Sequence, residues 1–268
     1  MRPVTWKTNQ TLAAAFALAM AALALTPPAT ARASDPEVLW KLVHDQCVPD
    51  QTAHGSPAHC LAVDLTRGDA VLKDRTGPNQ VLLIPTDRVT GVESAALQGP
   101  AGARYFVDAW AARQWVDKQA GQSVPRDDLS LAANSIDGRS QNQLHIHVDC
   151  LRADVKSALA AAIAAQKLNA AWVPFPLLGH NYRARTLTQS QFARTNLFKL
   201  IASSDPAAQA NMGTQTIVVA AVTFASGADG FVLLNDSIDA EAGDPASGEE
   251  LQDHSCQLLQ PSPPPPAH

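Results

Sequence analysis

The stretch SQNQLHIHVDC, residues 140–150, sets two histidines and a carboxylate into an apolar alternation. Successive side chains of a β-strand point to opposite faces, so Leu144, Ile146 and Val148 would share one face. The opposite face would carry the polar residues Gln141, Gln143, His145, His147 and Asp149. The stretch therefore predicts a strand with one core face and one row of polar groups.

Three interpretations of the polar row remain open on these residues alone. It could be the solvated side of an ordinary strand. His145 and His147 could instead ligate a metal, with Asp149 as a third ligand. A histidine could also attack phosphorus, if an acceptor holds its other nitrogen and fixes the tautomer. Asn134 and Gln141 lie just upstream across a turn, where they could donate hydrogen bonds to phosphate oxygens.

The rest of the chain predicts an α+β fold on an antiparallel sheet, because strand and helix patterns alternate irregularly. Short leucine-rich or β-branched runs predict strands within residues 60–65, 69–74, 79–85, 129–135, 216–224 and 230–236. Apolar spacing and alanine content predict helices within residues 35–47, 103–121, 154–172 and 190–204.

Composition narrows the possible partners. The chain has 268 residues, of which 46% are hydrophobic, so it can bury a substantial core. Its formal charge of -5 and its lack of a basic cluster interleaved with aromatics argue against nucleic acid as a partner.

The first 33 residues follow the plan of a secretory leader. Arg2 and Lys7 precede an apolar run over residues 12–25, and Ala31 and Ala33 fit a cleavage site before Ser34. The run is shorter than the roughly 18 to 20 residues of a spanning helix, which favours a cleaved signal peptide over an uncleaved membrane anchor. We expect a catalytic domain over residues 34–259 and a disordered proline-rich tail over residues 260–268.

Export makes disulfides the expected state of the four cysteines. Three pairings are possible, and the sequence alone does not choose among them. A loop rich in Pro, His, Gly and Ser between Cys47 and Cys60 favours that pair, which leaves Cys150 with Cys256.

The order of motifs resembles a known superfamily. Asn134, the turn SIDGRS, Gln141 and NQLHIH are similar to the histidine-triad signature, in which Asn, a glycine-containing turn and Gln lead into His-x-His-x-His. With GPNQVLLIPTDRVTGVES, VVAAV, GHNYRAR and LQDHSC, the body from about residue 38 to 259 resembles the bacterial CDP-diacylglycerol pyrophosphatases, membrane-associated members of that superfamily.

The resemblance implies hydrolysis of CDP-diacylglycerol to CMP and phosphatidate through a CMP-histidine intermediate. His147 would be the nucleophile and His145 its helper, while Asn134 and Gln141 would contact phosphate. The GHNYRAR stretch would bring His180, Tyr182 and Arg185 to the second phosphate. No metal, other cofactor or obligate protein partner is implied.

The resemblance also implies a place in the cell. The catalytic domain would lie on the periplasmic side of the bacterial inner membrane and meet its substrate at the membrane surface. If the leader is cleaved, the alternative is a soluble periplasmic protein.

Asp149 departs from the third triad position of better-known relatives, where His or Gln stands. Since a carboxylate repels a diphosphate, we expect it to orient water or the His147 imidazolium. Two rival functions stay open: a metal-dependent phosphodiesterase using His145, His147 and Asp149, and a non-catalytic periplasmic protein that binds nucleotide or lipid.

Overall fold

The strands form one antiparallel sheet. The computed structural model describes residues 35–260, and within them nine strands pair in the order β1-β2-β3-β5-β4-β8-β9-β7-β6. Their bounds are β1 Ala62–Asp64, β2 Asp69–Lys73, β3 Val81–Pro85, β4 Leu129–Ala133, β5 Ile146–Cys150, β6 Val173–Pro174, β7 Arg183–Thr188, β8 Gln215–Thr223 and β9 Asp229–Ser237. The predicted α+β fold on an antiparallel sheet is confirmed, and β8 and β9, two of the predicted strands, pair as a hairpin.

The helices lie between and around these strands. Their bounds are α1 Val38–Leu42, a π-helical turn Val43–Cys47, α2 Val48–His54, α3 Gly102–Ala120, α4 Ala153–Ala164, α5 Gln189–Phe192, α6 Leu197–Ala202 and α7 Pro206–Ala210. The predicted helix over residues 154–172 ends early, because Gln166 adopts a left-handed φ of 55°. The one predicted over residues 190–204 is two helices, since Asn196 is extended and caps α6 by accepting from the Lys199 N–H.

One face of the sheet packs against α3. Ile146 and Val148 of β5 belong to the same buried cluster as Phe106 and Trp110 of α3. This is the core face that the alternation over residues 140–150 predicts. The opposite, polar face of β5 is therefore free to form a site.

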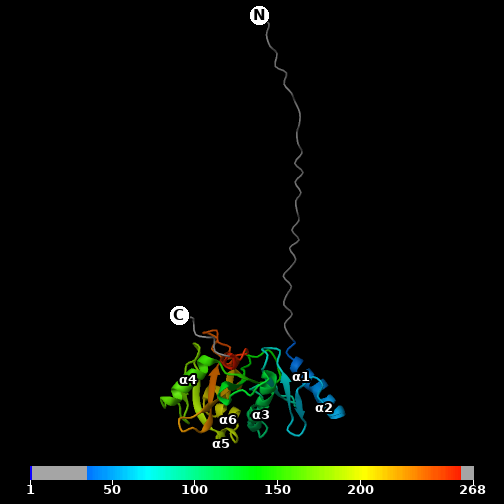
Figure 1. The fold of residues 1–268 in the computed structure, drawn as a ribbon, viewed down its shortest axis with the longest axis horizontal. Coiled ribbons are helices and arrows are strands. Elements are labelled where there is room, and N and C mark those ends of the chain that lie inside the picture. The colour runs from blue at the N-terminus through cyan, green and yellow to red at the C-terminus, as the bar shows by residue number, and fades with distance from the viewer. Residues whose placement is uncertain (2–34, 261–268) are drawn as a thin grey trace. The chain divides into compact units, whose positions relative to one another are not determined.

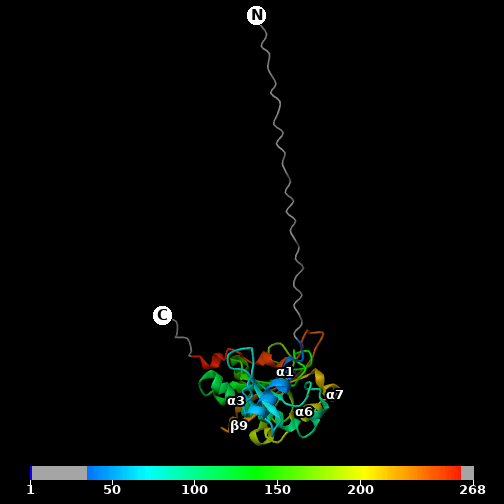
Figure 2. The same cartoon turned by 90° about the vertical axis from the view of Figure 1, so that its right-hand side faces the viewer.

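The opposite face of the sheet carries two separate apolar clusters. One gathers around α4 and includes Val155 and Leu159, and the other gathers around α1 and includes Leu39 and Val43. Figure 1 shows α4 and the α1–α2 region at opposite ends of the sheet, and Figure 2 views the molecule with α1 in front. His147 pairs with Leu82 of the α1 cluster on β3 and with Ala132 of the α4 cluster on β4. The polar row of β5 thus lies in the gap between the two clusters.

A C-terminal segment, residues 238–256, crosses this face after β9; we call it the strap. At Gly248 the strap lies so close to the sheet that a Cβ would sit 2.5 Å from Val218 Cγ2 and 2.9 Å from Thr216 Oγ1. Only glycine fits there without a shift of the sheet. The strap ends in a disulfide from Cys256 to Cys150 of β5.

Both favoured cysteine pairs are present. Cys47 bonds to Cys60 across 13 residues, and Cys150 bonds to Cys256 across 106 residues. The first encloses α2 and the loop that follows it, and the second fixes the strap to β5, the strand that carries His147.

Within residues 35–260, no helix combines the length and the apolar character needed to cross a membrane. The predicted leader and proline-rich tail fall on residues 2–34 and 261–268, outside the described residues.

The two disulfides should differ in their effect on stability. In the chain-entropy account, opening the long Cys150–Cys256 loop by a double Cys→Ser change costs about 4 to 5 kcal/mol of unfolding free energy. The same change at Cys47 and Cys60 should cost about 3 kcal/mol, because its loop is shorter. Urea unfolding of both variants under oxidising conditions measures the difference, and equal losses would contradict it.

Candidate active site

A cavity of about 570 Å³ opens where the polar face of β5 meets α1. It is lined by both histidines, by an apolar wall and by several charged side chains: Val38, Leu39, Leu42, His59, Leu72, Lys73, Asp74, Arg75, Thr76, Leu82, Gly138, Arg139, Ser140, Gln141, His145, His147 and Glu249. A larger hollow of about 680 Å³ lies beside α3, but no histidine lines it. The chemistry of the lining therefore points to the smaller cavity.

His145 is held by the backbone at one nitrogen and lines the cavity. Its Nδ1 lies 2.7 Å from the carbonyl oxygen of Gln143, and since a carbonyl only accepts, Nδ1 carries the proton. Nε2 then keeps its lone pair, and it has no hydrogen-bond partner among residues 35–260. Burial, followed by the nearby His147, lowers the pKa of His145 to about 4, so the ring is neutral at physiological pH. A neutral imidazole with a fixed tautomer and an unengaged Nε2 is the form a nucleophile needs.

His147 is also held at Nδ1, but by side chains instead of a backbone carbonyl. Its Nδ1 lies 3.1 Å from Glu249 Oε1 and 3.7 Å from Asp74 Oδ2, whereas its Nε2 is buried without a partner. Gln80 completes the set: with the amide oriented to satisfy both ends, its oxygen accepts from His147 Nδ1 at 2.9 Å and its nitrogen donates to Asp74 Oδ2 at 3.3 Å. The ring lies edge-on to His145, with centroids 4.8 Å apart. A phosphate approaching His147 Nδ1 would meet two carboxylates.

The cationic side chains of the cavity differ in their freedom. Arg139 donates two hydrogen bonds to Glu93, of 2.8 and 2.7 Å, and is buried. Lys73 donates to the backbone carbonyls of Asp74 and Gly77. Arg75 is exposed and has neither an ion pair nor a side-chain hydrogen bond among residues 35–260. Arg75 is thus the cavity arginine best placed to meet a phosphate.

Asp74 remains ionised beside this positive charge. Burial opposes its ionisation, but contacts with His147 and with the backbone N–H of Thr76 outweigh burial and lower its pKa. The cavity therefore has an acidic corner at His147 and a cationic rim at Arg75.

The residues predicted to contact phosphate divide into two groups. Gln141 lines the cavity, with its Oε1 accepting from the Leu39 N–H of α1 at 3.0 Å. Asn134 lies behind the lining: its Nδ2 donates to Glu249 Oε2 at 2.7 Å and its Oδ1 accepts from the Gly248 N–H. Asn134 positions a carboxylate and does not line the cavity.

The GHNYRAR residues are not part of this cavity. His180 and Tyr182 lie against the strap near β9, where Tyr182 donates to Glu250 at 2.6 Å. Arg185 alternates with the inward-facing Ala184 on β7, so its side chain leaves the sheet on the α3 side, near Trp172. The expected contacts with a second phosphate have no support from this placement.

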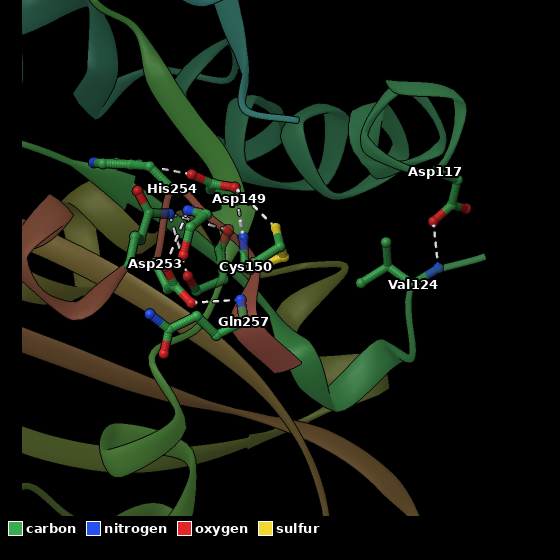
Figure 3. Close-up of a disulfide and its surroundings, with 11 residues drawn as sticks. Asp117, Val124, Asp149, Cys150, Asp253, His254 and Gln257 are labelled. Carbon is green, nitrogen blue, oxygen red and sulfur yellow. Dashed lines mark hydrogen bonds and ion pairs between the residues drawn. A yellow bond between two sulfur atoms is a disulfide. The ribbon is translucent and has the colours of Figure 1, made fainter. Parts of the chain in front are cut away.

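Asp149 has a partner that the sequence did not suggest. Its carboxylate is fully buried, lies 2.7 Å from His254 Nδ1 and accepts from the Cys150 N–H (Figure 3). Burial raises the pKa of Asp149, while the hydrogen bond to Asp149 raises the pKa of His254. Asp149 thus holds the end of the strap beside the Cys150–Cys256 disulfide. Asp149 is not among the residues that line the cavity.

Sequence reasoning missed Gln80, Asp74 and Glu249, the side chains around His147. They lie 67 to 102 residues away from His147 in the chain. No spacing rule connects positions so far apart, and single acidic residues in loops give no signal by themselves. Only the order of β2, β3 and β5 and the path of the strap bring them together.

Comparison with known proteins identifies the family. The family model described as CDP-diacylglycerol pyrophosphatase matches residues 34–260. This chain belongs to that family. A CDP-diacylglycerol pyrophosphatase of Yersinia pestis is 41% identical over 230 residues, which cover 85% of this chain and 87% of the relative. The family resemblance expected from the motif order is confirmed.

The low pKa of His145 predicts a pH-dependent contribution to stability. The unfolded histidine has a pKa near 6.5, so acidification from about 6.5 to 4 protonates the unfolded state first and destabilises the fold by about 3 kcal/mol. His145→Asn removes this term, so wild type should lose stability relative to the variant over that pH range. Urea unfolding of both proteins from pH 4 to 7 measures it; a difference in unfolding free energy that does not vary with pH would contradict the buried neutral ring.

Proposed function

We propose that this chain hydrolyses CDP-diacylglycerol to CMP and phosphatidate through a CMP-histidine intermediate formed on His145. Membership of the CDP-diacylglycerol pyrophosphatase family supports the overall reaction. The observation that favours His145 is its Nδ1 contact with the Gln143 carbonyl, which leaves Nε2 as the free nucleophilic atom in the cavity. The assignment of His147 as nucleophile from motif position stays a prediction, and its buried Nε2 argues against it.

In the first step, the Nε2 lone pair of His145 attacks the phosphorus bonded to the cytidine ribose. The bond from that phosphorus to the bridging oxygen breaks, and phosphatidate leaves with the electron pair. The Gln143 carbonyl stabilises the imidazolium through Nδ1–H. A phosphate monoester leaving group has its second pKa near 6, so it needs little protonation.

In the second step, water attacks the same phosphorus and the P–N bond breaks, which returns the neutral His145. A proton must leave the water as it attacks. The acidic corner of Asp74, His147 and Glu249 lies beside the ring and offers acceptors for that proton. His147 would thus assist the second step as an acid–base group.

The walls of the cavity suit an amphiphilic substrate. Leu39, Leu42 and Leu82 form an apolar side, while the exposed Arg75 supplies a cation for the diphosphate. The apolar side would contact the lipid part or the cytosine base. Substrate would enter from a membrane surface, since its acyl chains stay in the bilayer.

A cluster of possible metal ligands supports a second candidate function, a metal-dependent reaction. Ligand atoms of Asp74, His147 and Glu249 lie within 4.8 Å of one another, close enough to hold a divalent cation. In that case a metal-bound water would attack directly, and no histidine adduct would form. This would be a metal-dependent phosphodiesterase with Asp74 and Glu249 in place of Asp149.

Trapping the adduct separates these possibilities. We expect rapid quenching with substrate radiolabelled at the cytidine phosphorus to give labelled wild-type protein that is stable to alkali and labile to acid. His145→Ala should give no labelled protein and lose at least about a thousandfold in CMP release. His147→Ala should still form the adduct but turn over about a hundredfold or more slowly, because an acid–base group is lost. His54→Ala, at an exposed histidine of α2, is the control and should behave as wild type.

Each of the other possible results would favour a different nucleophile or a different function. Adduct in His145→Ala but not in His147→Ala would return the nucleophile to His147. CMP release without any adduct would favour the metal-dependent phosphodiesterase. Substrate binding without CMP release would favour a non-catalytic lipid- or nucleotide-binding protein.

We infer that the chain is exported and that its leader is removed before Ser34. The apolar run of the leader is short, both cysteine pairs form disulfides, and the family match starts at Ser34. The processed protein would then act from the periplasmic side of the inner membrane. Intact-mass measurement of protein from its native host should give a chain beginning at Ser34; a chain that retains Met1 would indicate an uncleaved anchor.

A further inference from the structure

The GHNYRAR stretch and the strap form a second polar cluster, separate from the catalytic cavity. His180 Nδ1 lies 2.7 Å from Asp244 Oδ2 and 3.9 Å from Asp236 Oδ2. Asp236 belongs to β9, Asp244 to the strap, and His180 to the loop that precedes β7. The cluster therefore joins three segments that are far apart in the chain.

In Asp236 and in Asp244, one carboxylate oxygen accepts a hydrogen bond from a nearby backbone N–H, and the other oxygen points toward His180. Asp236 Oδ1 accepts from the Ser237 N–H, and Asp244 Oδ1 accepts from the Ala246 N–H. Asp236 Oδ2 has no hydrogen-bond partner although its side chain is only 4% exposed. His180 Nδ1, despite its short distance from Asp244, is not aligned for a hydrogen bond. Three ligand atoms thus converge, and no hydrogen bond joins His180 Nδ1 to either carboxylate.

The charges of the cluster do not balance among its own members. Asp236 and Asp244 are both buried, and Glu250 Oε1 adds a third carboxylate 3.4 Å from His180 Nδ1. One imidazole, that of His180, faces these three acids. Ionised carboxylates that are buried together repel one another, so the folded state gains stability from a positive charge placed between them. A bound cation would supply that charge.

We propose that His180, Asp236 and Asp244 bind a divalent cation of the zinc class, which fastens the strap to the sheet. Ligand atoms of the three residues lie within 4.8 Å of one another. One imidazole nitrogen with carboxylate oxygens suits Zn²⁺, and water can complete a tetrahedron; an all-oxygen set would suit Ca²⁺ or Mg²⁺ better. Tyr182 and Glu250 form the layer behind the ligands, with Tyr182 donating to Glu250. The cation would be structural, since it lies outside the cavity lining.

The metal content of the purified full chain tests the site. After treatment with EDTA and dialysis, the wild-type protein should take up about one equivalent of Zn²⁺. Added Zn²⁺ should also raise the melting temperature, because a cation that binds only the folded state stabilises that state. Asp236→Asn and His180→Ala should weaken uptake by at least about tenfold. Glu241→Gln is the matched control: it removes one exposed carboxylate of the same strap and should bind as wild type.

A second comparison guards against a variant that merely folds badly. Without metal, Asp236→Asn should be at least as stable as wild type, because it removes a buried carboxylate facing Asp244; with Zn²⁺, it should be less stable. His147→Ala should still take up Zn²⁺, because His147 lies in the catalytic cavity and not in the cluster of His180, Asp236 and Asp244. The proposal fails if wild type takes up no Zn²⁺, if Asp236→Asn binds as wild type does, or if uptake depends on His147. These outcomes do not depend on the histidine adduct, so they are separate from the test of catalysis.

Discussion

The strap pressed against the sheet at Gly248 is the constraint on which the site depends. A side chain larger than hydrogen at this position would collide with Val218 and Thr216, so the strap would have to lift. Glu249, the next residue, contacts His147, and Glu250 accepts from Tyr182. One close approach therefore sets the position of carboxylates in two clusters.

The strap is held at both of its ends. Toward the C-terminus, the Cys150–Cys256 disulfide and the contact of Asp149 with His254 fix it to β5. At the other end, Asp244 lies in the cluster with His180 and Asp236. Since β5 carries His147 and begins directly after His145, these attachments join the strap to the segment that holds both histidines. This is why the proposed cation matters although it is outside the cavity.

The two histidines show how environment separates chemically identical side chains. His145 is bound by a neutral carbonyl, and burial lowers its pKa to about 4, which keeps its ring neutral, as the proposed nucleophile must be. His147, two residues along the strand, faces the carboxylates of Asp74 and Glu249. A negative corner next to a neutral imidazole suits removal of a proton from water better than attack on a diphosphate. The assignment by motif position alone could not take these neighbours into account.

Local patterns determined much of this protein in advance. The alternation over residues 140–150 identified the core face of β5, and strand patterns with glycine turns gave the antiparallel sheet. The motif order gave the family, which the comparisons confirm. Helix ends were less predictable: Asn196 divides one predicted helix because its capping role depends on the local backbone path.

Contacts between distant residues were decided only by the tertiary structure. Asp149 is on the predicted face of its strand, yet its partner His254 comes from the far end of the strap. Tyr182 and His180 were expected at the phosphates, but the strand order places them with β9. Periodicity reports which face a side chain occupies, because that depends on neighbours in the chain. It cannot report what crosses over that face, because this depends on how strands order and how the strap returns across them.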